Sequence, residues 1–113
     1  MYTDRDLLDT FPYEGTFFRT FVDESKPLDE RKEERIDLLT IKCDIQGNRS
    51  GMGYFLNASF SIYIPWDVND KLPFKRGDLF ESNIFGMIVN GEIIGIYPSQ
   101  LGGCSIYIKD MDV

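Results

Sequence analysis

The chain has 113 residues, a length that suits one domain. Hydrophobic residues make up 42% and aromatic residues 14%, too large an apolar share for a disordered chain. The net charge of −7 gives the surface the wrong sign for gripping nucleic-acid phosphates. No apolar run approaches the roughly 18 residues that span a bilayer, so we expect no membrane association.

The chain begins with acidic residues and lacks the apolar stretch of a secretory signal, so we expect synthesis in the cytoplasm. Residues 1–10 are predicted to form a flexible arm or one helical turn. TFFRTFV, residues 16–22, is β-branched and aromatic and is predicted to be a strand. The charge-dense residues 23–35, which hold one proline, are predicted to form a long solvated loop.

Period-two alternation marks the next strands. In residues 36–46, apolar side chains at 39, 41, 43 and 45 alternate with polar ones, which predicts a half-buried strand. Residues 47–53 contain three glycines and are predicted to form a flexible loop. Residues 54–64 alternate again, and Pro65 ends that strand because proline cannot donate to a ladder.

The last third of the chain is predicted to hold a hairpin and a closing strand. Two apolar runs, 79–89 and 92–97, flank Asn90-Gly91, the dipeptide that best fits a two-residue hairpin turn. Gly86 and Gly95 interrupt these runs and predict bends or bulges. Residues 98–103 predict a corner, and Cys104, Ile106 and Ile108 predict the inward face of a final strand.

About six strands without a convincing amphipathic helix define an all-β class. We predict one domain over residues 1–113, a small antiparallel β-barrel with a long charged loop, because a closed barrel removes exposed strand edges. A two-sheet β-sandwich is the alternative.

Few residues in the sequence are candidates for catalysis or metal binding. The chain has no histidine, so it lacks the usual proton shuttle and histidine metal ligand, and we predict no enzyme activity, cofactor or metal. Cys43 and Cys104 fall on the apolar phases of predicted strands and are predicted to be buried, reduced thiols. A disulfide bond between them is the alternative if their strands are neighbours. The Arg76-Gly77-Asp78 tripeptide is better explained by a turn than by integrin binding.

Two groups of residues are candidate interface contacts. Charged residues of 23–35 could pair with a neighbour's charges, and aromatic side chains on or near the wet strand phase could anchor a partner. These candidates are Glu30, Arg31, Lys32, Arg35, Tyr63, Trp66 and Tyr107.

The order of the parts resembles the head-closure, or head–tail connector (neck), proteins of tailed bacteriophages. The resemblance runs from about Ile36 to Val113. It is carried by TIKCDIQ, a flexible loop, a long strand, and then FKRGDLFES and IFGMIVNGEIIGIYPSQLGG before a closing strand. The matching positions are Gln46, Gly77, Asp78, Gly86 and Ile88.

The resemblance implies a structural virion protein of the phage neck with a small β-barrel fold. Such proteins form homo-oligomeric rings, typically of twelve copies, between the portal and adaptor proteins and the tail, and help close or gate the DNA channel. DNA would pass nearby without specific binding, because an acidic wall repels its phosphates. By position the channel loop would be Gly47, Asn48, Arg49, Ser50, Gly51, Met52 and Gly53.

Two other functions stay open. A small acidic inhibitor could mimic DNA and block a nucleic-acid enzyme, but the acids of 23–37 are interleaved with basic residues. A carbohydrate- or ligand-binding β-module would use Trp66 and the tyrosines in an aromatic-lined cleft.

Overall fold

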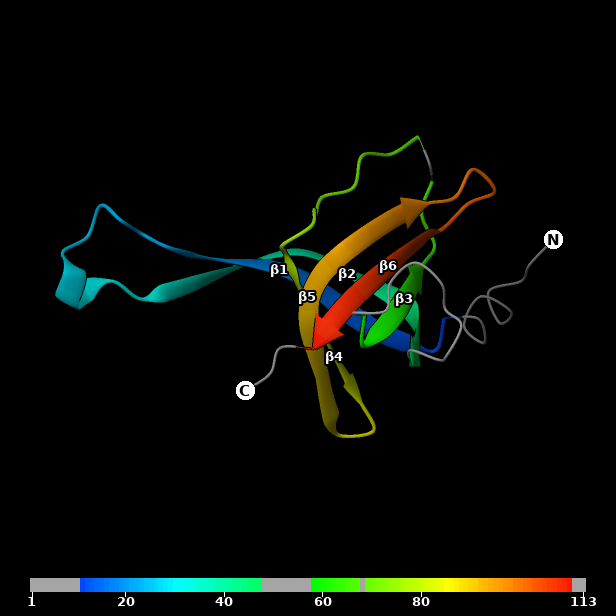
Figure 1. Cartoon of the computed structure of the whole chain (residues 1–113), viewed down its shortest axis with the longest axis horizontal. Coiled ribbons are helices and arrows are strands. Elements are labelled where there is room, and N and C mark those ends of the chain that lie inside the picture. Colours follow the sequence, from blue (N-terminus) through cyan, green and yellow to red (C-terminus); the bar gives the residue numbers. More distant parts are fainter. Residues whose placement is uncertain (1–10, 48–57, 68, 111–113) are drawn as a thin grey trace.

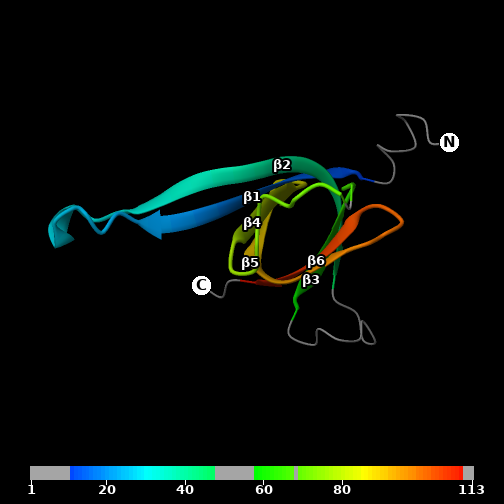
Figure 2. The same cartoon turned by 90° about the horizontal axis from the view of Figure 1, so that it is seen from above.

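A computed structural model describes residues 11–47, 58–67 and 69–110. Its strands are β1 (Tyr13–Val22), β2 (Glu33–Gly47), β3 (Phe60–Ile64), β4 (Leu79–Ile84), β5 (Met87–Pro98) and β6 (Cys104–Asp110), and a 3₁₀ turn, η1, spans Leu28–Glu30. All neighbours are antiparallel, and a β1–β4 ladder closes the order β1-β2-β3-β6-β5-β4 into a ring (Figures 1 and 2). The predicted all-β barrel is therefore confirmed.

The core fills the barrel with the inward-facing phase of each strand. Phe17 of β1 stacks on Phe74 at 4.0 Å between ring centroids and lies 4.9 Å from Phe80 of β4. Burying aromatic rings of this size supplies much of the hydrophobic free energy of a small domain. The cluster is completed by Cys43, Phe60, Ile62, Ile64, Ile93, Cys104, Ile106 and Ile108.

Strand β6 follows the predicted alternation closely. Cys104, Ile106 and Ile108 are fully buried, whereas Ser105 and Tyr107 are half-buried on the other face. The described part of the predicted 54–64 strand is shorter, because β3 begins at Phe60 and residues 54–57 lie outside the described ranges.

The predicted hairpin turn at Asn90-Gly91 is wrong. Both residues lie inside β5, and the β4–β5 turn is instead at Phe85-Gly86, where both φ angles are positive, at 50° and 82°. Gly91 serves another purpose, since a Cβ there would collide with Lys109 O and Ile108 Cγ2 of β6. The glycine thus allows close approach of two strands rather than a reversal of the chain.

The two glycines predicted to mark bends or bulges, Gly86 and Gly95, have different settings. The β5–β6 register shifts between Ile93 and Gly95, which confirms an irregularity beside Gly95. Gly86 is in the turn rather than in a bulge. The connection 65–78 packs Trp66, Leu72 and Phe74 against the core.

The predicted 23–35 loop is too long at its C-terminal end. Residues 33–35 belong to β2 and pair with β1 as far as Val22↔Glu33, so the connection is 23–32. Residues 33–35 are all charged and show no apolar–polar alternation, so the sequence predicts a loop there. A two-stranded ribbon with both faces in water can form without such alternation. Within the described ranges, no helix is long and apolar enough to cross a membrane.

Candidate interaction site on the β1–β2 arm

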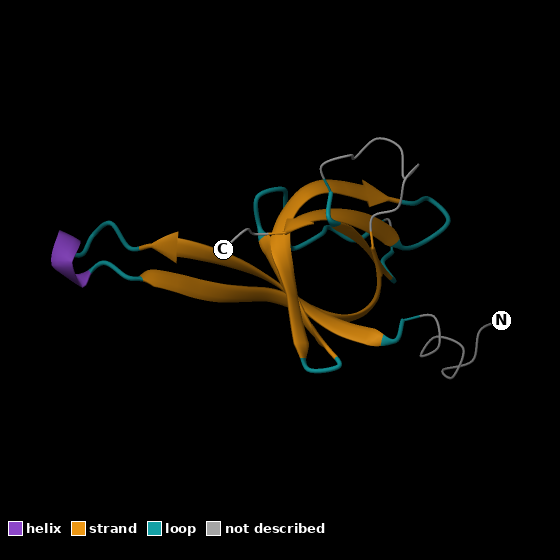
Figure 3. Cartoon of the chain, turned by 60° about the horizontal axis from the view of Figure 1, so that its bottom comes forward, coloured by secondary structure: helices purple, strands orange, loops and turns teal. Residues whose placement is uncertain are grey.

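The most prominent feature outside the barrel is a projecting ribbon, which we call the arm: residues 19–36, comprising the ends of β1 and β2 and the connection between them (Figure 1). The β1–β4 ladder stops at Phe18, so beyond this point β1 pairs only with β2. Figure 3 shows η1 at the far end of the arm. The arm contributes to a molecule measuring 55 × 30 × 30 Å.

The connection at the tip of the arm is held by its own polar contacts. Arg31 donates to the carbonyls of Lys26 at 3.0 Å and Glu24 at 2.9 Å. Asp23 accepts hydrogen bonds from the side chain and backbone of Ser25, which lower the pKa of Asp23. The tip is therefore an ordered turn, which lowers the entropy lost if a partner binds it.

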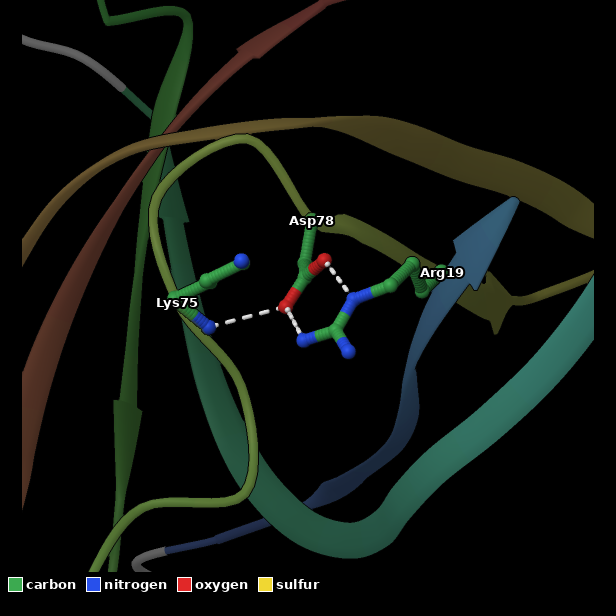
Figure 4. Close-up of polar contacts among 3 residues, drawn as sticks. All are labelled: Arg19, Lys75 and Asp78. Atoms are coloured by element: carbon green, nitrogen blue, oxygen red, sulfur yellow. Dashed lines mark hydrogen bonds and ion pairs between the residues drawn. The ribbon is translucent and has the colours of Figure 1, made fainter. Parts of the chain in front are cut away.

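One face of the arm is fixed to the barrel by Arg19 and Asp78. Arg19 Nε donates to Asp78 Oδ1 at 2.7 Å and Arg19 Nη2 to Oδ2 at 2.8 Å, while the backbone N–H of Lys75 donates to Oδ2 at 2.9 Å (Figure 4). The Asp78 side chain is only 3% exposed. The hydrogen bonds from Arg19 hold the pKa of Asp78 below its ordinary value, against the opposing effect of burial.

The opposite face of the arm is fixed by Arg35. Its Nη2 lies 2.6 Å from Glu81 Oε1 on β4, and its Nε donates to Asp37 Oδ1 at 2.7 Å. The guanidinium also lies 3.9 Å from the centre of the Phe18 ring, a cation–π contact. The hydrogen bonds to Glu81 and Asp37 raise the pKa of Arg35, which stays charged.

Beyond these two clamps, the arm exposes apolar side chains on both faces. Phe21 lies on the Arg19 face and Val22 lies on the other, and they are 39% and 48% exposed. Ile36, which is level with Arg19 on the same face, is 50% exposed. Leu28 at the tip is 80% exposed. Apolar groups held outward on an anchored ribbon are suited to contact with another protein.

The outer edge of β2 is also open. Within the described ranges, β3 pairs with β2 only from Asp44 to Gly47, so the edge from Glu33 to Lys42 has no ladder partner. The chain turns away after Ile64 because Pro65 cannot continue the ladder. An open edge of this length can accept a strand by β-addition.

The structure separates the predicted interface residues into two groups. Glu30, Arg31 and Lys32 are exposed at the tip of the arm, whereas Arg35 is held at its root by Glu81 and Asp37. The charged candidates thus gather on one projection, although not all are free to meet a partner.

The aromatic candidates lie on the barrel and already have contacts there. Tyr63 stacks on Phe11 and donates to Gly102 O at 3.0 Å; Trp66 packs on the core and donates to Asp70 O at 3.0 Å. Tyr107 is half-buried and meets Tyr97 edge-on. These contacts give the three side chains structural roles.

Of the candidate channel loop, Gly47 ends β2, and residues 48–53 lie outside the described ranges. Cys43 and Cys104 are buried and free, as predicted for unpaired thiols, and burial raises the pKa of both. Burial of Asp78 removes the Arg76-Gly77-Asp78 tripeptide as an exposed recognition motif.

Sequence reasoning missed Arg19, Phe21 and the open edge of β2. A lone arginine in an aromatic strand pattern gave no signal, because its partner lies 59 residues away. In comparisons with known proteins, no family model and no curated protein matches the chain.

Proposed function

We propose that the protein is a structural assembly module that joins neighbouring protein subunits through its arm. The carrying observation is that the arm projects from the barrel, is clamped at its root on both faces and exposes apolar groups beyond the clamps. A two-stranded ribbon alone is marginal in water, so an anchored one that extends into solvent is best explained by a partner that covers it.

The setting that we propose is the neck of a tailed bacteriophage, between the portal and adaptor proteins and the tail. The support is the resemblance over residues 36–113, the barrel fold and the acidic composition. A ring needs two different patches on each subunit, and the tip of the arm (residues 23–32) and the open β2 edge beside the barrel (residues 37–42) supply two such patches. DNA would pass the acidic ring without being gripped.

The two alternatives have less support. The described cavity is lined by Glu14, Thr16, Glu81, Ser82, Asn83 and Ile88, without an aromatic residue to stack on a sugar. The acids of residues 23–37 are not a bare phosphate-like array, because the carboxylate of Glu34 lies 3.7 Å from Lys26 Nζ and Asp37 pairs with Arg35.

Electron microscopy of the protein mixed with portal–adaptor complexes tests this function. We expect added ring-shaped density at the end of the complex and its loss when residues 23–32 are replaced by Asn-Gly. That variant keeps the barrel, because Val22 and Glu33 are already register partners and a two-residue turn can join them. No added density with the wild-type chain would contradict the neck setting.

A further inference from the structure

A second exposed feature, distinct from the arm, is the tip of the β4–β5 hairpin. Phe85, Met87 and Ile88 are 94%, 69% and 70% exposed. The turn lies at the bottom of the barrel in Figure 1, whereas the arm extends to the left. Three large apolar side chains within four residues form a patch that a monomer would not need.

The conformation of Phe85 adds an independent observation. Its φ of 50° is in the left-handed region, where bulky side chains are disfavoured and Asn or Gly is preferred. The ring gains almost no burial within the described chain in return. A residue that breaks the local rule without a gain in folding is a candidate for function.

Charge indicates what can approach this patch. Residues 83–91, NIFGMIVNG, contain no charged side chain in a chain of net charge −7. The hairpin tip itself therefore adds no like charge to a contact with a second copy. The stretch lacks the basic residues that would draw it to anionic lipid.

A pocket lies at the base of the same hairpin. The β1–β4 ladder ends at Gly15↔Ser82, where Ser82 Oγ donates to Glu14 O at 2.7 Å. Here the strands leave an open pocket of about 290 Å³, lined by Glu14, Thr16, Glu81, Ser82, Asn83 and Ile88. Benzene fits a cavity of about 150 Å³, so the volume suffices for a ring. The positive edge of the ring suits the carboxylates of Glu14 and Glu81, which also pair with Lys42 and Arg35.

We propose that two copies of the chain clasp each other through these hairpins, each inserting Phe85 into the pocket of the other. Because tip and pocket share one hairpin, a single two-fold axis satisfies both contacts at once. The area is small, since an aromatic side chain buries only about 150–250 Å². The dimer is therefore weak and forms only at high protein concentration. The proposal does not rest on the arm.

Sedimentation velocity over a wide concentration range tests the clasp. We expect wild type to shift from monomer to dimer as concentration rises, and Phe85→Asn to stay monomeric while melting no lower than wild type, since Asn suits the turn. Leu101→Asn is the matched control: Leu101 is 99% exposed but lies in the β5–β6 connection, so this variant should dimerise normally. The variant with residues 23–32 replaced by Asn-Gly should also dimerise.

Three results would overturn the proposal. The first is a wild-type chain that remains monomeric throughout. The second is a dimer that Phe85→Asn leaves intact or that Leu101→Asn removes equally. The third is Phe85-dependent pelleting with phosphatidylcholine vesicles by a monomeric chain, which would assign the tip to lipid. Because the arm variant retains this interface, failure of the clasp is distinguishable from failure of the proposed assembly function.

Discussion

Arg19 on β1 holds both carboxylate oxygens of Asp78, at 2.7 and 2.8 Å. Asp78 directly precedes β4, and its backbone carbonyl accepts a hydrogen bond from Ile93 N of β5 at 2.9 Å. The pair therefore connects the start of the arm to a rigid part of the barrel. A planar two-point contact fixes direction as well as distance, so the angle at which the arm leaves the barrel is set here.

Asp78→Asn tests this connection. The amide retains an oxygen for the N–H of Lys75 but loses the charge-assisted bonds from Arg19, so we expect the free energy of unfolding to fall by about 1–3 kcal/mol. Denaturant titration measures the change, and hydrogen exchange should accelerate at arm amides. Glu81→Gln, which alters a half-exposed ion pair, should cost less than about 1 kcal/mol. Equal costs for the two variants would refute a special role for Asp78.

Acid stability provides a second test of Asp78. The pKa of Asp78 is lower in the folded chain than in the unfolded chain. At a pH near these values the folded state therefore binds fewer protons than the unfolded state, and acid favours unfolding. The stabilisation should be complete above the unfolded value of about 3.9 and should disappear as the pH drops through the lower folded value. Thermal melts between about pH 6 and 2 should show a shallower loss for Asp78→Asn. Identical pH dependence in both proteins would contradict the assignment.

Gly91→Ala should destabilise the barrel, although the sequence there resembles a tolerant turn. The new Cβ would meet the Lys109 carbonyl and Ile108 of β6, so we expect a cost of about 1–3 kcal/mol from overpacking. Gly47→Ala is the control, because nothing in the described chain lies within 4 Å of a Cβ at that position. Equal chemical-denaturation midpoints for the two variants would show that β5 and β6 are not closely packed here.

The two thiols should react slowly in the folded protein. Cys43 is fully buried, and desolvation raises its pKa to about 12, so little thiolate exists at pH 8. We expect an aromatic disulfide reagent to label both cysteines rapidly only after denaturant is added. Fast labelling of the native chain at Cys43 would indicate that the barrel opens at β2.

The barrel could be predicted from sequence because its determinants are local. Alternation at Cys104, Ile106 and Ile108 repeats every second residue, and one buried face is enough to produce it. The β4–β5 turn was misplaced because Asn90-Gly91 fits the turn better than Phe85-Gly86 does. Gly91 instead lies against Lys109 and Ile108 of β6, a long-range contact that no short-range pattern reports.

The candidate site was only partly predictable. Charge density located the tip residues Glu30, Arg31 and Lys32, but it could not show that β1 and β2 continue as a ribbon beyond the barrel. The clamps pair residues far apart in the chain, Arg19 with Asp78 and Arg35 with Glu81. Such pairs follow from topology, which composition and periodicity do not specify.

Mass measurement of the assemblies that the chain forms is the most direct test of assembly through the arm. Native mass spectrometry would compare wild type with the variant carrying Asn-Gly in place of residues 23–32, each with portal–adaptor complex. We predict a defined multimer bound to the complex for wild type, and only free chain, at most the weak dimer, for the variant. A wild-type chain that never joins the complex, or a variant that joins it equally well, would contradict the account.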